Sequence, residues 1–415
     1  MIKSILRRLR QLSRRIHLRV ILFATMALLA LLIARWLGHL IPDDLGGNIG
    51  ADAVDQILNI LASSMLAVTI FSLTIMLNAL TNAASLWTPR AHLILREDTV
   101  TQSVLSNFLG AYLFALVAIV MRAANLFDER EIVVLFFMSL VVVAMIVISL
   151  IRWILHLEGL GSLTFTASRL EQEAQAAIRR AAQYPCHGAH ALTDPDAQVP
   201  RDALAIKADR SGYLQQIFEA ALQAEAESRD LRIYIPVPVG RYVLHGEVLA
   251  WVAGGEALHE TAETVLRESL PLSAVRSFEQ DPLFGLSVLS EVAERALSPG
   301  VNDPGTAIDV VNRLARVLAP ARVGPAEETP CDRLWAVPLK AQSLFEESLD
   351  PIARAAGDSL NVHLALQRVC HQLAAQAEHA PIREAAAAMA ETCLDRAAQD
   401  ITFGPDMERL RAVAG

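Results

Sequence analysis

The stretch from Asp55 to Trp87 is long and apolar enough to cross a bilayer, yet polar side chains recur along its whole length. On a helix that turns by about 100° per residue, six of these side chains fall on one face. They are Gln56, Ser63, Thr74, Asn78, Thr81 and Ser85. Because hydroxyl and amide groups in hydrocarbon need hydrogen-bond partners, we expect this face, the polar stripe, to meet another helix, a second copy of the chain or water. Helix packing is the ordinary role of such a stripe, and a pore or substrate path is the functional alternative.

Hydropathy divides the chain into two parts. With 53% hydrophobic residues and a mean hydropathy of +0.36, the 415 residues are too apolar for an ordinary soluble protein, but 20% charged residues exclude a chain that is membrane throughout. The long apolar runs end near His156, and the remainder has the composition of a globular domain. The net charge of -9 gives no support for a nucleic-acid partner. The four cysteines are widely spaced without a CxxC pair, as expected in a reducing compartment.

Four apolar runs predict four membrane crossings, which together form a transmembrane domain over residues 20–156. The predicted spans cover residues 20–40, 55–87, 104–124 and 132–155. The leader 1–19 is rich in Arg and Lys, whereas the connection 42–54 contains neither. Arg90 follows the second span and Arg152 ends the fourth, on the same side as the leader. Since basic residues favour the cytoplasmic side, we expect both termini to lie in the cytoplasm.

The part after the spans is predicted to be a cytoplasmic α+β domain, in which a small β-barrel-like unit is covered by a helical layer. The expected divisions are a helical extension and linker at 157–200, a β-rich unit at 201–255 and a mainly helical domain at 256–415. Apolar residues at helical spacing support the extension, namely Leu170, Ala174, Ala177 and Ile178. The hairpin around Gly240 and Gly246 resembles that of biotinyl and lipoyl domains. It lacks their Met-Lys pair, so no covalent cofactor is expected.

A turn between two amphipathic helices, at residues 298–306, is the most informative soluble stretch. Its Asp303 is a good N-cap residue and Pro304 suits the first helical position. A helix start also presents free N–H groups, so an anion could bind there, although capping is the ordinary role. The candidate residues for a ligand site or capping corner are Arg276, Gln280, Asp281, Ser298, Asn302, Asp303, Gly305 and Thr306.

Metal and catalytic signals are weak. Cys186, His187 and His190 offer only three ligands, without a fourth at a recognised spacing. His371 directly follows Cys370, and adjacent residues do not face one way on a helix. The sequence contains no phosphate-binding loop, dinucleotide fingerprint, zinc-protease motif or nucleophile elbow. We therefore predict neither a metal, nor a cofactor, nor an enzyme.

Several motifs together resemble one bacterial family. The chain combines four predicted spans with TPR at 88–90, SGYLQQI at 211–217, QDPLFGL at 280–286 and RALSPGVNDPGTA at 295–307. This combination is similar to the family catalogued as domain of unknown function 2254, a predicted membrane protein. The resemblance implies a bacterial inner-membrane protein and brings no established activity or catalytic residue.

Two functional hypotheses follow. In the first, the protein is a homo-oligomeric channel or transport protein, in which copies of the second span line a path for a small ion and the cytoplasmic domain gates it. In the second, it is a membrane-anchored sensor or scaffold whose corner at 298–306 binds a small anion or a protein, and the polar stripe serves only for packing. Both have the lipid bilayer as a partner.

Overall fold

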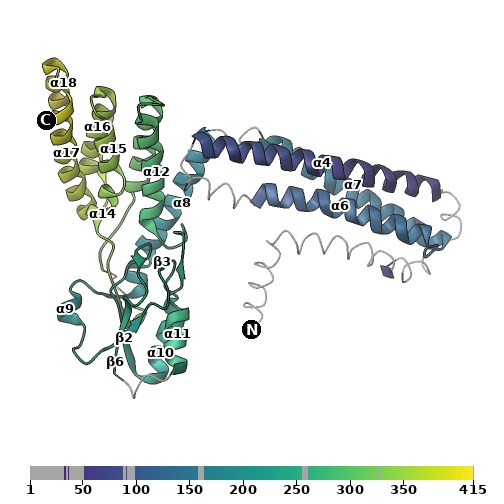
Figure 1. The fold of residues 1–415 in the computed structure, drawn as a ribbon, viewed down its shortest axis with the longest axis horizontal. Coiled ribbons are helices and arrows are strands. Elements are labelled where there is room, and N and C mark those ends of the chain that lie inside the picture. Colours follow the sequence, from purple (N-terminus) through teal and green to yellow (C-terminus); the bar gives the residue numbers. More distant parts are fainter. Residues whose placement is uncertain are drawn as a thin grey trace. The chain divides into compact units, whose positions relative to one another are not determined.

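The computed structural model describes residues 51–86, 90, 99–157, 163–254, 260–325 and 328–414, together with Leu32, Ile33 and Trp36. The chain forms two compact units, which are described separately (Figure 1). The first unit holds residues 1–86 and 92–166, and the second holds residues 87–91 and 167–415.

The first unit contains three long apolar helices. These are α4 (Ala51–Leu86), α6 (Thr99–Ala123) and α7 (Glu129–Leu157). Within the described residues, three segments are long and apolar enough to cross a membrane, namely Asp52–Asn78, Val100–Ala123 and Glu131–Leu157. They match three of the four predicted spans. The predicted span at 20–40 lies outside the described residues, apart from the three side chains named above.

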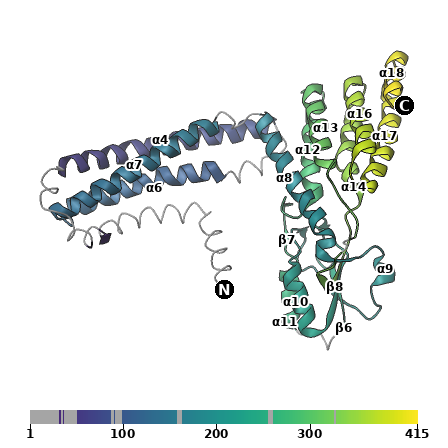
Figure 2. The same ribbon diagram turned by 180° about the vertical axis from the view of Figure 1, so that it is seen from behind.

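Two polar contacts fix the arrangement of these helices. Arg122, near the end of α6, donates from Nε and Nη2 to both carboxylate oxygens of Asp55, at the start of α4, over 3.0 and 2.8 Å. Asn107, in the third turn of α6, donates to Ser149 Oγ, about two turns before the end of α7, over 2.9 Å. The helices α4 and α7 therefore both run antiparallel to α6, and Figure 2 shows the three lying side by side. Apolar side chains such as Phe108 fill the space between them.

The second unit is built on an open, mixed five-stranded sheet. The strands follow the order β1 (Ala189–Ala191), β8 (Cys331–Ala336), β4 (Leu231–Ile235), β6 (Val248–Gly254) and β2 (Leu204–Lys207). Strands β1, β8 and β4 are parallel, whereas β6 pairs antiparallel with both β4 and β2. One face is buried against α10 (Glu219–Arg229) and α11 (Glu260–Glu268) through residues such as Leu222 and Leu266. On the other face Trp335 stacks on Tyr234, with ring centroids 4.7 Å apart.

The predicted barrel-like unit at 201–255 is wrong. Strands from that region are shared between the large sheet and a small sheet of order β5 (Tyr242–Val243), β3 (Gly212–Leu214) and β7 (Leu272–Ser273). The cause is a long-range pairing: β8 joins β4, so β4 has a neighbour from a distant part of the chain instead of closing onto a local strand. Neither sheet forms a closed barrel.

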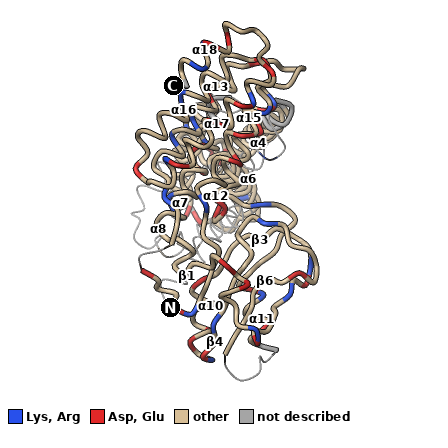
Figure 3. The backbone as a smooth tube through the Cα atoms, turned by 90° about the vertical axis from the view of Figure 1, so that its left-hand side faces the viewer, with Lys and Arg blue, Asp and Glu red and all other residues tan. Residues whose placement is uncertain are grey.

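Helices cover the rest of the second unit. Its longer helices include α8 (Leu163–Gln183), α12 (Pro282–Leu297), α13 (Pro304–Leu318), α16 (Leu360–Gln376) and α17 (Ala380–Asp400). The shorter elements are η2 (Pro185–Gly188), α9 (Pro195–Gln198), α14 (Ala341–Glu346), α15 (Leu349–Ala355) and α18 (Gly404–Ala414). The residues Leu170, Ala174, Ala177 and Ile178 form the buried face of α8. Along the second unit, acidic and basic residues are interspersed, as Figure 3 shows.

Candidate functional site

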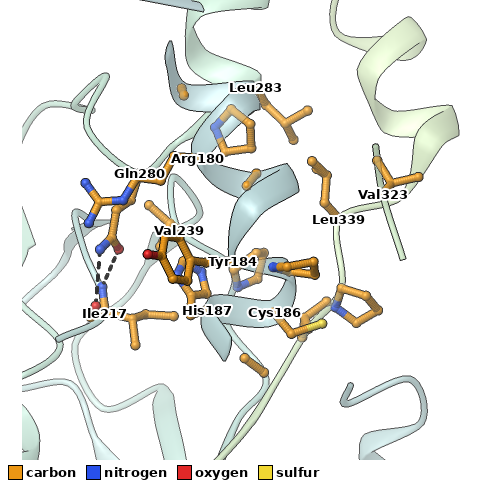
Figure 4. Close-up of a pocket in the computed structure, with 18 of the residues that line it drawn as sticks. Arg180, Tyr184, Cys186, His187, Ile217, Val239, Gln280, Leu283, Val323 and Leu339 are labelled. Atoms are coloured by element: carbon orange, nitrogen blue, oxygen red, sulfur yellow. Dashed lines mark hydrogen bonds between the residues drawn. The ribbon is translucent and has the colours of Figure 1, made fainter. Parts of the chain in front are cut away.

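The second unit contains a cavity of about 720 Å³. Its walls come from the end of α8, the turn η2, the loop after β4, the start of α12 and the segments on either side of β8. Figure 4 shows Tyr184 and His187 beside Val239 in its middle. The lining residues that matter below are Arg180, Ala181, Tyr184, Cys186, His187, Ile217, Glu219, Val239, Gln280, Leu283, Arg322, Val323, Leu339 and Lys340. The volume is within the range of about 300–1,000 Å³ that is usual for small-molecule sites.

The turn η2 has an uncommon backbone. Cys186, His187 and Gly188 all have positive φ angles, of 50°, 58° and 73°. The left-handed conformation costs a residue with a Cβ roughly 1–2 kcal/mol, and such strain concentrates at functional sites. The backbone N–H of His187 donates to the carbonyl of Tyr184 over 3.0 Å, which closes the turn. The strained backbone thus belongs to Cys186 and His187, whose side chains line the cavity.

Both side chains of this turn are held uncharged. Burial raises the pKa of the Cys186 thiol to about 11, so it is protonated at neutral pH and is a poor nucleophile. Burial also lowers the pKa of His187, an effect that Glu219 opposes and Arg180 strengthens. A neutral imidazole offers one hydrogen-bond donor and one acceptor. The turn can therefore bind polar groups, but it does not supply a thiolate.

The structure does not bring Cys186, His187 and His190 together as ligands. The ring of His190 stacks on Trp335 with centroids 4.9 Å apart, on the far face of the sheet, and its Nε2 lies 3.2 Å from the carbonyl oxygen of Asp332. In the part of the chain that the structure describes, no three His, Cys, Asp or Glu side chains are grouped to hold a metal ion.

Three cationic side chains border the cavity. Arg322 forms an exposed ion pair with Glu378 over 3.1 Å. Arg180 and Lys340 are exposed and have no ion-pair partner among the described residues. Figure 4 places Arg180 beside Gln280 at one side of the cavity, and places Leu283, Leu339 and Val323 at the other. Arg180 and Gln280 thus lie at one side of the cavity, whereas Arg322 and Lys340 directly neighbour the apolar Val323 and Leu339 in the chain.

Three of the predicted corner residues lie at the start of α12. Gln280, which lines the cavity, accepts from the backbone N–H of Ile217 over 2.8 Å and donates to its carbonyl over 3.3 Å. Asp281 caps α12 by accepting from the N–H groups of Leu283 and Phe284, and pairs with both Nε and Nη2 of Arg276 over 2.8 and 2.9 Å. Burial raises the pKa of Asp281, and Arg276 opposes that shift. All three side chains thus hold the start of α12 in place.

The other predicted corner residues lie at the opposite end of α12, so the structure does not assemble the proposed single pocket. A helix of 16 residues is about 24 Å long. Asp303 caps α13 by accepting from Thr306 N over 3.0 Å and from Thr306 Oγ1 over 2.5 Å, and these bonds lower the pKa of Asp303. Ser298 Oγ donates to the carbonyl of Arg295 over 2.6 Å. Asn302 has a φ of 49° and is exposed, as is Gly305.

The polar stripe lies on the exposed side of α4. Gln56, Ser63, Thr74, Asn78 and Thr81 are all exposed, whereas Val54, Leu58, Leu61 and Met65 form the face that packs within the first unit. The hydroxyls of Ser63, Thr74 and Thr81 donate to carbonyls of their own helix, over 2.7, 2.9 and 2.8 Å. This local bonding reduces the need for outside partners. The helix includes Ser85, whose side chain lies outside the described set.

The sequence did not indicate the cavity, because its residues come from separate segments between Ala177 and Ser343 that only the folded unit brings together. One signal was present. PVPV at 236–239 places proline directly after β4, AVPL at 336–339 places proline two residues after the end of β8, and both segments line the cavity. Proline cannot donate to the ladder, so it favours the end of a strand.

Comparison with known proteins identifies a family. A family model described as "Predicted membrane protein (DUF2254)" matches residues 13–372. Uncharacterized proteins of Mycobacterium bovis and of Mycobacterium tuberculosis strain H37Rv are each 36% identical over 124 residues, which is 28% of this chain and 23% of the relative. The chain thus matches about a quarter of the length of these curated relatives. No solved structure matches the chain. Because the family model covers most of the sequence, the chain belongs to the DUF2254 family of membrane proteins.

Proposed function

We propose that this membrane protein is a sensor, in which the cavity of the second unit binds a small molecule and α8 carries its effect toward the membrane. The observation that carries the proposal is that α8 itself lines the cavity, through Ala177, Arg180 and Ala181. In the chain, α8 follows α7, the last candidate span, after residues 158–162. A ligand in the cavity would therefore contact the helix that leads to the membrane part.

The middle of α8 is held by charge. Glu171 is buried and receives Arg313 Nη1 over 2.9 Å and Arg316 Nε over 2.7 Å, both from α13. Burial by itself would raise the pKa of Glu171, but the two arginines outweigh it and hold the pKa below the usual range. In this proposal the ion pairs of Glu171 tie α8 to α13, so the two helices move together. A change at the cavity end of α8 is then transmitted along the helix.

The orientation part of the proposal places the second unit in the cytoplasm. Since α4 and α7 both run antiparallel to α6, their carboxyl ends lie on one side of the membrane. Arg90 follows α4 and Arg152 lies in the last turns of α7. Basic residues favour the cytoplasmic side, and the second unit follows α7 on that same side.

Filling the cavity tests the sensor proposal without knowledge of the ligand. Ala181→Trp places a large side chain in the cavity from a half-buried position, and Arg179→Trp places the same side chain on α8 away from the cavity. Hydrogen exchange is measured on the full chain in lipid nanodiscs. We expect Ala181→Trp to slow exchange in the first half of α8 and at the end of α7, and Arg179→Trp to leave both unchanged. Equal exchange in the two variants would contradict the proposal.

A second candidate, a conduit lined by copies of α4, is favoured by one observation. The polar stripe lies on the exposed side of α4, where a second copy of the chain could meet it. Asn78→Leu would abolish ion flux through protein in sealed liposomes if α4 lines a path. Leu77→Ala, on the neighbouring exposed position, is the matched control. Flux that is absent from the wild type, or unchanged by Asn78→Leu, would remove this candidate.

A further inference from the structure

We infer that the cavity of the second unit takes an amphipathic carboxylate, a molecule with an aliphatic chain of medium length and one anionic head group. This inference rests on the proposed ligand-binding role of the cavity and adds the chemical class of the ligand. It follows from three features of the walls, namely a group of aliphatic side chains, two cations without an ion pair among the described residues, and the hydrogen bonds that Gln280 and the start of α12 already make.

The apolar side fits a flexible aliphatic chain. Leu283, Val323 and Leu339 lie together at one side in Figure 4, and prolines and valines from the segments after β4 and β8 continue this surface. The aromatic or imidazole rings among the lining residues are Tyr184 and His187, which lie beside each other. A site built for a nucleobase or other planar ring usually supplies an aromatic face on which the ring stacks. Aliphatic walls favour a ligand that gains free energy by burying methylene groups.

Two cationic residues of the lining fit an anionic head group. Arg180 and Lys340 border the cavity without ion-pair partners among the described residues, whereas Glu219 is the one acidic side chain among the lining residues. A guanidinium group binds a carboxylate with two parallel hydrogen bonds. The neutral His187 adds one donor without adding charge.

Other donors near the cavity are already in use. The first N–H groups of α12 are bound by Asp281, and the amide of Gln280 is bound to Ile217 on both its atoms. These groups therefore serve the fold first. Arg180 and Lys340, which line the cavity without an ion pair among the described residues, are the cations assigned to the head group, and the role of each is testable by substitution.

Equilibrium dialysis with radiolabelled decanoate tests the inference. The full chain is held in lipid nanodiscs, and binding to empty nanodiscs is subtracted. Decanol provides the same chain without charge, decyl phosphate provides another anionic head, and acetate provides the head without the chain. We expect saturable binding of one decanoate per chain, weaker binding of decanol and no binding of acetate. If decyl phosphate displaces radiolabelled decanoate more effectively than unlabelled decanoate does, the site prefers phosphate head groups, and the inference of a carboxylate is wrong.

Two neighbouring arginines of α8 give a matched pair of variants. Arg180→Gln removes a cation of the cavity, and we expect decanoate binding roughly tenfold weaker, the usual effect of losing a charge-assisted hydrogen bond. Arg179→Gln removes a charge from the same helix, where Arg179 bonds Gln175 instead of lining the cavity, and should leave binding unchanged. Equal decanoate binding by wild type and Arg180→Gln would overturn the inference.

The inference and the proposed function can fail separately. If decanoate does not bind but Ala181→Trp still changes hydrogen exchange along α8, the ligand class is wrong and the sensor proposal stands. If decanoate binds and is displaced by Ala181→Trp, but exchange along α8 is unchanged, the ligand class stands and the sensor proposal is wrong.

Discussion

Gly285 of α12 lies directly against Ala174 of α8, so closely that a Cβ on Gly285 would stand 2.7 Å from the Cβ of Ala174. Both residues are buried, and the contact joins the helix that lines the cavity to the helix that forms its far wall. The helix α8 can therefore pack this closely against α12 because residue 285 is glycine and has no Cβ.

Gly285→Ala is expected to destabilise the second unit. Overpacking a tight contact costs about 1–3 kcal/mol, and the better helix propensity of alanine returns about 1 kcal/mol of that. The free energy of unfolding of the full chain should fall by up to about 2 kcal/mol in denaturant titrations. Gly404→Ala, where no atom lies within 4 Å of the new Cβ, is the control and should be neutral or slightly stabilising. A neutral Gly285→Ala would show that the helices separate without cost.

Glu171→Gln is expected to lower the free energy of unfolding more than Glu173→Gln, a change on the same helix. It removes the buried countercharge of Arg313, whose side chain is 7% exposed and which keeps its ion pair with the more exposed Asp309, and breaking a buried pair costs up to about 3–5 kcal/mol. The partly exposed pair of Glu173 with Arg169, over 3.7 Å, gives the comparison. Glu173→Gln should change the free energy of unfolding by less than about 1 kcal/mol. Similar losses in the two variants would contradict the coupling role given to Glu171.

Acid should weaken the second unit in two steps of the same sign. The pKa of His187 is lowered from 6.5 in the folded chain, so the unfolded chain takes up a proton first and stability falls as the pH drops through about 6.5. The pKa of Glu171 is also lowered, so its contribution is present above its ordinary value of 4.5 and is lost as the pH falls through the folded value. Thermal unfolding midpoints recorded from pH 8 to pH 5 resolve the first step.

His187→Asn isolates the histidine, because asparagine tolerates the left-handed backbone of this turn. The variant should lose part of the midpoint shift between pH 8 and pH 5. His363, whose pKa burial lowers too, would contribute the remainder. A midpoint that rises on acidification in the wild type would mean that His187 is charged in the folded chain.

The antiparallel arrangement of α4 and α6 predicts a specific cross-link. Cysteines placed at Asp55 and Arg122 should be joined in membranes by a short reagent that links two thiols, because the long Arg122 side chain contacts Asp55 while a disulfide needs Cα atoms within about 7 Å. Cysteines at Asp55 and Asn107 should not be joined, since Asn107 precedes Arg122 on α6 by about four turns. Efficient cross-linking of the second pair would contradict the arrangement.

Exchanging the charges, with Asp55→Arg and Arg122→Asp together, should restore expression that each single change lowers.

Local sequence patterns predicted much of the fold, but they did not predict strand pairings between residues far apart in the chain. The apolar stripes of α12 and α13 and the N-cap at Asp303 depend on neighbours within four residues, and the structure has them where the periodicity indicated. The parallel pairing of Ile233 with Leu334 joins residues about a hundred positions apart, and no local pattern encodes it. The error of the barrel-like unit follows from that pairing.

The candidate site was harder to predict for a related reason. Arg276 and Asp281 were grouped with Ser298 and Thr306 because polar residues near a turn suggest one pocket, but a rigid helix holds the two sets apart. The left-handed turn at Cys186 and His187 depends on tertiary contacts, since neither residue favours positive φ as glycine does. Sequence alone therefore found the residues with strong capping roles and missed those that line the cavity.

Small molecules that the purified protein carries show whether the cavity is a ligand site. Wild type, Ala181→Trp and Arg179→Trp are purified in parallel, and their extracts are compared by mass spectrometry. We expect an amphipathic carboxylate near one equivalent per chain in wild type and Arg179→Trp, and its depletion in Ala181→Trp. Identical extracts from all three proteins would contradict the claim that the cavity is a ligand site.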